Sequence, residues 1–428
     1  MVSFSGMRSD GYFKYYVISI GGLIFWTSVL ALKNEIKAVI VTFATSIVLS
    51  LYLVEGFLYL TGLDRVEFRT LKAASELGVK FDTRQKLDVV NDLRASGVDA
   101  VPSIHTAGLI ERARLHQKET DLLFPFGGVS NKVTVVSNES GKYMTIQSDR
   151  YGFNNPDFEW DVRDTEWLLT GDSFTEGYAV QFGEDIAGQI RVITNQSVLN
   201  LGRGGNGPLS TLAALKEYAE IIQPKKVIWL YYEGNDLDNE LNQEKEVPLL
   251  RRYLQSGFSQ DLIHKQKEID TYLSGYISNE EAKSFSKYRW LRLTGVRYLF
   301  SIIFRTDFTT KNPVDSAVDV SPLFSEILSE AKNRVGSWGG ELYFVYLPGY
   351  PRYVDSAVIH DSFRKKGKVI ESVKKLNIPV IDIHQKVFDG HSDPLSLFPL
   401  RLFGHYNADG YREVAQEIIS GSQTMSLD

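Results

Sequence analysis

The sequence predicts an α/β fold in which helices cover both faces of a parallel sheet, and an apolar segment precedes this fold. From residue 165 onward, short runs of consecutive apolar residues alternate with longer amphipathic stretches. Strands of a parallel sheet are buried on both faces, so they read as unbroken apolar runs. Before residue 63, by contrast, the chain carries two long stretches with almost no charge.

Five strands are expected in the α/β region, at residues 167–170, 198–201, 227–232, 342–347 and 379–383. Amphipathic patterns predict helices near residues 184–194, 208–222, 322–337, 360–376 and 408–420. Crossovers between parallel strands are right-handed, so the carboxyl ends of all five strands should meet at one edge of the sheet. Binding and catalytic groups in open α/β sheets gather at that edge.

Composition excludes several classes of chemistry. The chain has 428 residues, a net charge of −6 and no cysteine. The charge gives no basic surface for nucleic acid, and the absence of cysteine excludes disulfides, thiolate catalysis and cysteine-ligated metal sites. The seven histidines form no His-x-x-x-His pair. We therefore expect no cofactor, no metal ion and no nucleic-acid partner, and the sequence specifies no protein partner.

The N-terminal segment predicts a transmembrane helical hairpin over residues 1–63. Residues 15–32 are uncharged, and a second uncharged run covers residues 38–54. Each run approaches the roughly 20 residues that a helix needs to cross a bilayer. The distribution of basic residues places the flanks only weakly on the cytoplasmic side. The alternative is a signal peptide cleaved after Val29-x-Ala31 and followed by a buried helix.

The rest of the chain is expected to divide into a connecting module and a main domain. Residues 64–160 predict a charged helical stalk and then a β-hairpin around residues 138–141. Residues 161–428 predict the main domain, with a helical insertion at about 237–320. The second half of the insertion interleaves basic and large apolar residues. It can be a helical cap on the sheet, a substrate lid or a membrane-surface helix.

A serine lies at the end of the first predicted strand. Gly171-Asp172-Ser173 follows this strand directly and leads into a helix start. Backbone N–H groups at a helix start point toward a reacting oxygen, and the N–H of Ser173 can itself be one of the donors. Ser173 can therefore act as a nucleophile. Alternatively, it is an N-cap residue without chemistry.

Two further segments at the same edge can stabilise negative charge. In the glycine-rich segment 200–208, which follows the second strand, Gly205 can donate a backbone N–H. At the end of the third strand, the amide of Asn235 is a neutral donor. An alternative interpretation of the first segment is dinucleotide binding, since Gly202-x-Gly204-x-x-Gly207 matches that fingerprint and Glu233 lies where a ribose would be held.

The last segment supplies a base. His405 precedes the last predicted helix and can be directed across the edge of the sheet toward Ser173. The near-neutral pKa of histidine suits a group that accepts a proton and later returns it. A second histidine at this edge, His384, is expected to be structural.

With these four segments in order, the chain resembles the SGNH/GDSL hydrolase superfamily, and residues 165–421 carry the resemblance. It implies a flavodoxin-like three-layer α/β/α sandwich. It also implies that Ser173 is the nucleophile, that Gly205 and Asn235 complete an oxyanion hole, and that His405 is the base. The family usually places an aspartate three residues before the histidine, where this chain has Leu402. Asp393 is then the favoured orienting acid, ahead of Asp389 and Asp382, and a Ser–His dyad is the alternative.

The resemblance predicts a membrane-anchored serine esterase or O-acyltransferase. The apolar hairpin and the module after it are similar to those of membrane-bound relatives that modify cell-envelope or exported polysaccharides. The expected substrate is therefore an acyl ester carried by carbohydrate, and the expected location of the catalytic domain is the extracytoplasmic side of the membrane. The alternative is a non-catalytic protein of the same fold that binds glycan or assembles a complex, which the missing acid at Leu402 motivates.

Overall fold

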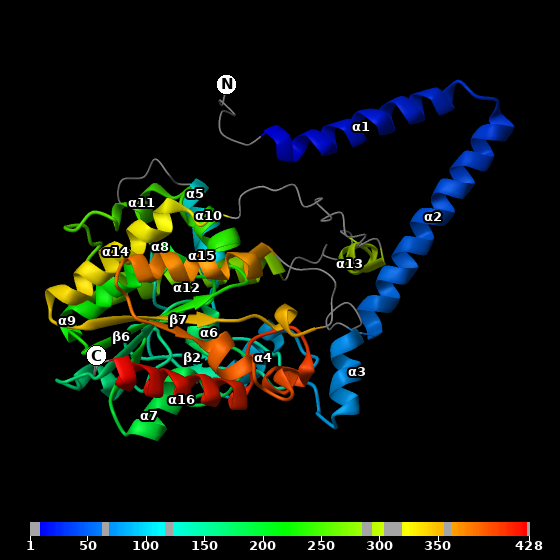
Figure 1. Cartoon of the computed structure of the whole chain (residues 1–428). Helices are drawn as coiled ribbons and strands as arrows, with labels where there is room; N and C mark the ends of the chain where they lie inside the picture. The colour runs from blue at the N-terminus through cyan, green and yellow to red at the C-terminus, as the bar shows by residue number, and fades with distance from the viewer. Residues whose placement is uncertain are drawn as a thin grey trace. The chain divides into compact units, whose positions relative to one another are not determined.

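The computed structural model describes residues 9–61, 68–115, 123–284, 293–303, 319–354 and 361–425. The chain divides into two compact units (Figure 1). The first, called here the apolar unit, comprises Met1–Asp64 and Lys287–Phe308. The second, called here the sheet unit, comprises Arg65–Ser286 and Thr309–Asp428. The chain therefore passes between the units at three places rather than once.

The sheet unit is built on five parallel strands in the order β5-β4-β6-β7-β8. All five predicted strands are confirmed, as β4 (Trp167–Thr170), β5 (Val198–Asn200), β6 (Lys226–Tyr232), β7 (Glu341–Leu347) and β8 (Val380–Asp382). In chain order this arrangement is 2-1-3-4-5, the order of flavodoxin-like sheets. The order reverses between β4 and β6, so the crevice of the fold lies where Ser173 follows β4 and Asn235 follows β6.

Helices cover both faces of this sheet, which confirms the three-layer sandwich (Figure 1). Alternate residues along the strands belong to two separate cores. One core is shared with α7 (Ile186–Thr194) and α16 (Ala408–Met425). The other is shared with α8 (Pro208–Ala214), α14 (Pro322–Ser337) and α15 (Asp361–Lys375). The helix predicted at 208–222 is divided, because a π-helical turn at Leu215–Ala219 separates α8 from α9 (Glu220–Ile222).

The connecting module belongs to the sheet unit. It contains α3 (Phe68–Glu76), α4 (Lys86–Ala95), α5 (Thr106–Leu115) and η1 (Asp157–Asp161). The predicted hairpin is confirmed, since β2 (Val133–Val135) pairs antiparallel with β3 (Thr145–Gln147). A strand that the sequence did not predict, β1 (Ala100–Pro102), pairs parallel with β2. Phe126 and Phe153 of this module share one core with Leu199 and Trp229 of the sheet, so it is integrated into the main body.

The insertion is divided between the two units. Its first half contains η3 (Asp236–Glu240), α10 (Leu241–Glu244), α11 (Pro248–Arg252), η4 (Leu262–His264) and α12 (Gln266–Ser284). Side chains of this half, including Leu250 and Ile269, are buried in the core of the sheet unit, as a helical cap requires. Its second half supplies α13 (Thr294–Ile303), which belongs to the apolar unit and contacts α2.

The apolar unit also contains α1 (Ser9–Leu30) and α2 (Asn34–Thr61). Among the described residues one helix is long and apolar enough to cross a membrane, over Asn34–Leu58 with a mean hydropathy of 2.0. In α1 the apolar stretch is shorter, Ser19–Leu30. The second span of the predicted hairpin therefore stays a prediction.

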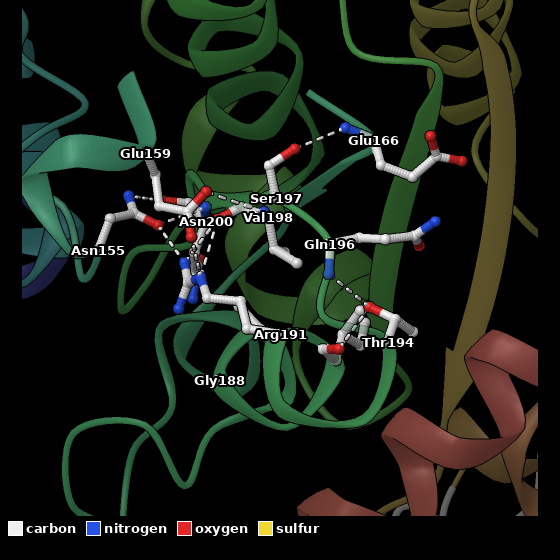
Figure 2. A network of polar contacts seen from close by, with 12 residues as sticks. Asn155, Glu159, Glu166, Gly188, Arg191, Thr194, Gln196, Ser197, Val198 and Asn200 are labelled. Atoms are coloured by element: carbon white, nitrogen blue, oxygen red, sulfur yellow. Dashed lines mark hydrogen bonds and ion pairs between the residues drawn. The ribbon is translucent and has the colours of Figure 1, made fainter. Parts of the chain in front are cut away.

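Three side chains cover the outer edge of β5, the edge strand that pairs with β4 (Figure 2). The Asn155 side chain accepts from the Asn200 N–H at 2.8 Å and donates to the Asn200 carbonyl at 3.0 Å. The Glu159 carboxylate accepts from the Val198 N–H at 3.2 Å, and Arg191 donates to the Val198 carbonyl at 2.6 Å. Side chains thus replace the missing neighbouring strand and satisfy backbone groups that would otherwise be unpaired.

Substituting Arg191 with alanine should destabilise the sheet unit strongly. Arg191 also contacts Glu159 at 3.1 Å, and both side chains are largely buried. Its loss leaves a buried carboxylate and a strand carbonyl without their partner, which costs about 3 kcal/mol. Urea unfolding of the full chain in detergent measures this loss. Arg412→Ala is the control, because its exposed pair with Asp409 contributes about 1 kcal/mol or less. Equal effects of the two substitutions would contradict the prediction.

Candidate active site

Ser173 begins α6 (Ser173–Glu176), directly after the carboxyl end of β4. Asp172 is the N-cap of this short helix, since its Oδ1 accepts from the Phe174 N–H at 2.9 Å. Gly171 has no room for a side chain, because a Cβ there would lie 2.7 Å from the Leu230 carbonyl oxygen of β6. The strand therefore turns sharply against its neighbour and presents Ser173 at the sheet edge. The Ser173 side chain is 7% exposed.

The structure brings His405 to Ser173. The Nε2 of His405 lies 2.7 Å from the Ser173 Oγ, although 232 residues separate them. Loop residues before α16 carry His405, and its ring packs between Phe174 and Tyr178, with centroid distances of 4.5 and 5.0 Å. A serine hydroxyl hydrogen-bonded to an imidazole nitrogen is the pairing that nucleophilic serine chemistry requires.

A carboxylate that the sequence did not reveal holds the other side of the ring. The Oε1 of Glu139 lies 2.7 Å from His405 Nδ1, and its Oε2 accepts from the His405 backbone N–H at 2.8 Å. Both oxygens thus serve one residue, which fixes the ring orientation and places a proton on Nδ1. Nε2 is then free to accept the proton of Ser173. Ser173, His405 and Glu139 form a continuous hydrogen-bonded chain, which is the arrangement that a nucleophilic serine, its base and an orienting acid require.

The expectation that Asp393 orients His405 is wrong. Asp393 pairs with Arg401 through two hydrogen bonds, at 2.7 and 2.8 Å, on the exposed surface. The alternative candidates do not serve either: Asp382 pairs with Lys366, and Asp389 lies 4.0 Å from His384. His384 itself contacts the Tyr353 hydroxyl at 2.8 Å, in agreement with its predicted structural role. No signal near His405 pointed to Glu139, because acidic residues in hairpin turns are ordinarily solvated.

The electrostatics of the pair suit a base. Burial alone would lower the pKa of His405, but the charge and hydrogen bond of Glu139 outweigh burial, and the pKa of His405 is raised. Asp172 and Glu176 raise it further. Burial would raise the pKa of Glu139, yet the interaction with His405 lowers it below its usual value. Glu139 is therefore ionised in the pH range where His405 titrates, and its charge stabilises the protonated imidazole.

Gly205 lies in the loop after β5, against the ring of His105. It has a positive φ of 83°, and a Cβ there would lie 2.1 Å from the ring of His105, so only glycine fits. The loop is held by Glu176, whose Oε2 accepts from the Gly204 N–H at 2.5 Å. Within the residues that the structure describes, the N–H groups of Ser173 and Gly205 have no hydrogen-bond acceptor. Both are therefore available to a developing oxyanion.

Asn235 lies at the same edge, above a cluster of buried acids. Its Nδ2 donates to Glu240 Oε1 at 2.8 Å, while its Oδ1 is buried without a partner. Carboxylate oxygens of Asp172, Asp236 and Glu240 lie within 4.8 Å of one another, an arrangement that could hold a hard cation. Burial raises the pKa of all three acids. A carboxyl group that keeps its proton in this cluster is uncharged, which reduces the repulsion among the three acids.

The module before the sheet contributes a second histidine, His105, which the sequence did not single out. It precedes α5 and lies against Gly205. Thr106 joins this segment to the loop that contains Gly205. Its N–H donates to the Gly204 carbonyl, and its hydroxyl donates to Asn206 Oδ1. Burial, and then the positive charges of Arg203, Lys86 and His405, lowers the pKa of His105. Its imidazole is accordingly neutral near pH 7.

Dinucleotide binding at Gly202–Gly207 is excluded by what occupies the helix start. The phosphates would bind the N–H groups at the beginning of α8. Here the Glu244 carboxylate accepts from the N–H groups of Gly207, Leu209 and Ser210 at 2.8 to 3.0 Å. Glu233, the expected ribose ligand, is buried in a pair with Arg352. The carboxyl oxygens of Glu244 therefore already occupy the position that a phosphate would need.

Comparison with known proteins gives structural matches only. No protein-family model and no curated protein matches the chain. A lipolytic protein of the G-D-S-L family from Desulfitobacterium hafniense matches 60% of this chain and 99% of its own, at 13% identity and a TM-score of 0.33. A lipase/acylhydrolase from Enterococcus faecalis matches 60% and 94%, at 16% identity and 0.34. A two-domain esterase active on acetylated mannans matches 64% and 52%, at 13% identity and 0.32.

The strand order and the contact between Ser173 and His405 define the class of this protein. A flavodoxin-like parallel sheet carries a serine after its first strand and a histidine before its last helix. The chain therefore has a flavodoxin-like α/β fold with a serine–histidine contact at one edge of its sheet.

Substituting Glu139 with glutamine should both slow Ser173 and shift its pH dependence. Glutamine removes the charge that raises the pKa of His405, so the neutral imidazole should persist to lower pH. The loss of orientation should reduce reactivity by about 10²- to 10⁴-fold. The rate at which a fluorophosphonate labels Ser173, followed against pH in the full chain, measures both effects.

Asp393→Asn is the matched control, because it removes an equal charge from a surface pair with Arg401. Its rate and its pH profile should equal those of the unmodified chain. A loss in Asp393→Asn together with an unchanged profile in Glu139→Gln would contradict the assignment of the acid.

Proposed function

We propose that this protein is a membrane-anchored serine esterase or O-acyltransferase that acts on acyl esters through an acyl-enzyme. The observation that carries the proposal is the continuous contact from Glu139 through His405 to Ser173, with distances of 2.7 Å at both steps. Such a chain activates a hydroxyl that is otherwise a weak nucleophile.

In the proposed mechanism, Ser173 Oγ attacks the acyl carbonyl while His405 Nε2 accepts its proton. Glu139 stabilises the imidazolium that forms. The N–H groups of Ser173 and Gly205 stabilise the negative oxygen of the tetrahedral intermediate. His405 then returns the proton to the leaving alcohol, and the acyl group stays on Ser173. Water or an acceptor hydroxyl, deprotonated in turn by His405, resolves the acyl-enzyme.

Asn235 is proposed as the third oxyanion donor, which requires its side-chain amide to rotate. Its Nδ2 now donates to Glu240 Oε1, and its Oδ1 is buried without a partner. A half-turn of the amide exchanges these atoms and presents the NH₂ group where Oδ1 lies now. The raised pKa of Glu240 fits this arrangement, because a protonated carboxyl can donate to Oδ1 after the turn.

The proposed substrate class is an acyl ester on a carbohydrate hydroxyl, and the proposed location of the sheet unit is the extracytoplasmic side of the membrane. The resemblance of the apolar hairpin and the module after it to membrane-bound relatives that modify polysaccharides supports the substrate class. The apolar stretch of α2 supports the membrane anchor, as it has the length and composition of a span. The non-catalytic alternative was based on the missing acid at position 402. The contact of Glu139 with His405 weakens that argument.

Substituting Ser173 with alanine should abolish both labelling by a fluorophosphonate and hydrolysis of a fluorogenic acetyl ester. The nucleophile is then absent, and the remaining rate should fall by about 10⁴-fold or more. Ser372→Ala is the control, since Ser372 lies on α15 and bonds only its own helix, at the Lys368 carbonyl. Ester hydrolysis by Ser173→Ala at the rate of the unmodified chain would contradict the proposed function.

His105 is proposed as a positioning residue for the substrate. Its Nδ1 accepts from the Ala107 N–H at 3.3 Å, so the neutral ring carries its proton on Nε2 and can donate it to a substrate oxygen beside Gly205. His105→Ala should raise KM about tenfold and change kcat less, as expected for the loss of about one hydrogen bond. His105→Gln, which keeps a donor, should restore part of the affinity.

His264→Ala is the control for His105, because His264 is exposed and pairs with Asp261. Ester hydrolysis measured over a range of substrate concentrations separates KM from kcat. An unchanged KM in His105→Ala would contradict the positioning role while leaving the nucleophile assignment intact.

A further inference from the structure

Glu55 is a buried carboxylate within the apolar stretch of α2. It is 5% exposed and lies three residues before Leu58, where the stretch ends. Its Oε1 accepts from the Gly295 N–H at 3.1 Å, and its Oε2 accepts from the Val296 N–H at 2.8 Å. These are backbone groups at the amino end of α13, where helix geometry leaves N–H groups without partners. Glu55 therefore joins α13 to α2.

An acidic residue in an apolar span is retained only where it has a partner. Placing a charge at the centre of a bilayer is unfavourable, and the cost falls toward the ends of a span. Glu55 lies near one end of its stretch and has two N–H donors. The contact therefore places the amino end of α13 at the level where α2 would leave the bilayer.

The sequence of α13 is amphipathic. Apolar residues recur at positions 296, 299, 300 and 303, which is the spacing of one helix face. Arg297 lies away from this face. Val296 is buried, Arg297 is exposed, and the aromatic ring of Phe300 is 50% exposed. The apolar face of α13 is thus only partly buried.

The segment around α13 is also strongly basic. Between residues 287 and 305 the chain has five basic residues and no acidic one: Lys287, Arg289, Arg292, Arg297 and Arg305. An apolar helix face with basic residues beside it matches the surface of a membrane that contains anionic lipids.

We propose that α13 is an in-plane membrane helix, docked on α2 through Glu55, whose apolar face enters the lipid. Its Arg297, together with the basic residues that flank α13 in the sequence, binds anionic phospholipid headgroups. This inference rests on the proposed membrane span of α2. Its consequence is a second attachment to the membrane: the chain leaves the apolar unit after residue 64, returns to it at residue 287 and leaves again after residue 308.

The natural chain contains no cysteine, so single cysteines can carry a nitroxide label without any background. We would label Phe300→Cys on the apolar face and Arg297→Cys on the polar face of α13. Leu49→Cys, 60% exposed on α2, reports the span, and Val192→Cys, 79% exposed on α7, is the aqueous control. The full chain is reconstituted in phosphatidylglycerol-containing nanodiscs, and accessibility to oxygen and to a water-soluble nickel complex is measured by EPR.

We expect the labels at positions 49 and 300 to favour oxygen, and the labels at 297 and 192 to be accessible to nickel. Nickel accessibility at 300 equal to that at 192, with position 49 in lipid, would overturn the α13 proposal and leave the span intact. Nickel accessibility at 49 would overturn the span and this inference together. An unchanged oxygen preference at 300 in phosphatidylcholine nanodiscs would overturn the part that concerns anionic lipids.

The docking contact has its own test in the same samples. Glu55→Ala should increase the mobility of the label at position 300, whereas Glu55→Gln keeps acceptor oxygen and should preserve most of the contact. Equal, unchanged spectra in both variants would overturn docking through Glu55. If Glu55→Ala does not fold, the mobility of the label in Glu55→Gln still tests the docking contact. The accessibility pattern measured with the native Glu55 still tests whether α13 lies in the membrane.

Discussion

The double contact of Glu139 with His405 is the interaction on which the site depends. A carboxylate that bonds both the ring nitrogen and the backbone N–H of one residue determines its tautomer, ring orientation and loop position together. Glu139 is itself held by the turn that contains it, where Asn138 accepts from the Gly141 N–H and donates to the Asp82 carbonyl. The position of His405 next to Ser173 therefore depends on the turn around Glu139 and on its contact with Asp82.

Buried carboxylates position most of the backbone around this site. Asp172 caps the nucleophile helix, Glu176 holds the Gly204 N–H, and Glu244 occupies the start of α8. Each acid satisfies N–H groups that would otherwise be buried without partners. Together they place negative potential around His405, since Asp172 and Glu176 add to Glu139 in raising its pKa. The groups that hold the loops in place thus also stabilise the charge that the base acquires.

Much of the sheet and of the site could be predicted from the sequence, because local patterns determine them. Buried parallel strands give unbroken apolar runs, and the handedness of crossovers brings their carboxyl ends to one edge, so the pairing of Ser173 with His405 follows from the sequence alone. Glu139 could not be found in this way. Its role arises from a contact across 266 residues, and its own neighbourhood reads as an ordinary turn. Likewise, nothing local to Gly202–Gly207 showed that Glu244 fills the anion position.

The site is assembled from the sheet and the connecting module, so its geometry depends on the packing between them. The nucleophile lies after β4, while the acid and His105 come from the module around β1 and β2. That module shares aromatic core residues with the sheet, so its separation would expose apolar surface and remove the acid in the same event. Local opening of the β2–β3 turn would suffice to leave a Ser–His pair without orientation. The fold therefore couples the integrity of the connecting module directly to the reactivity of Ser173.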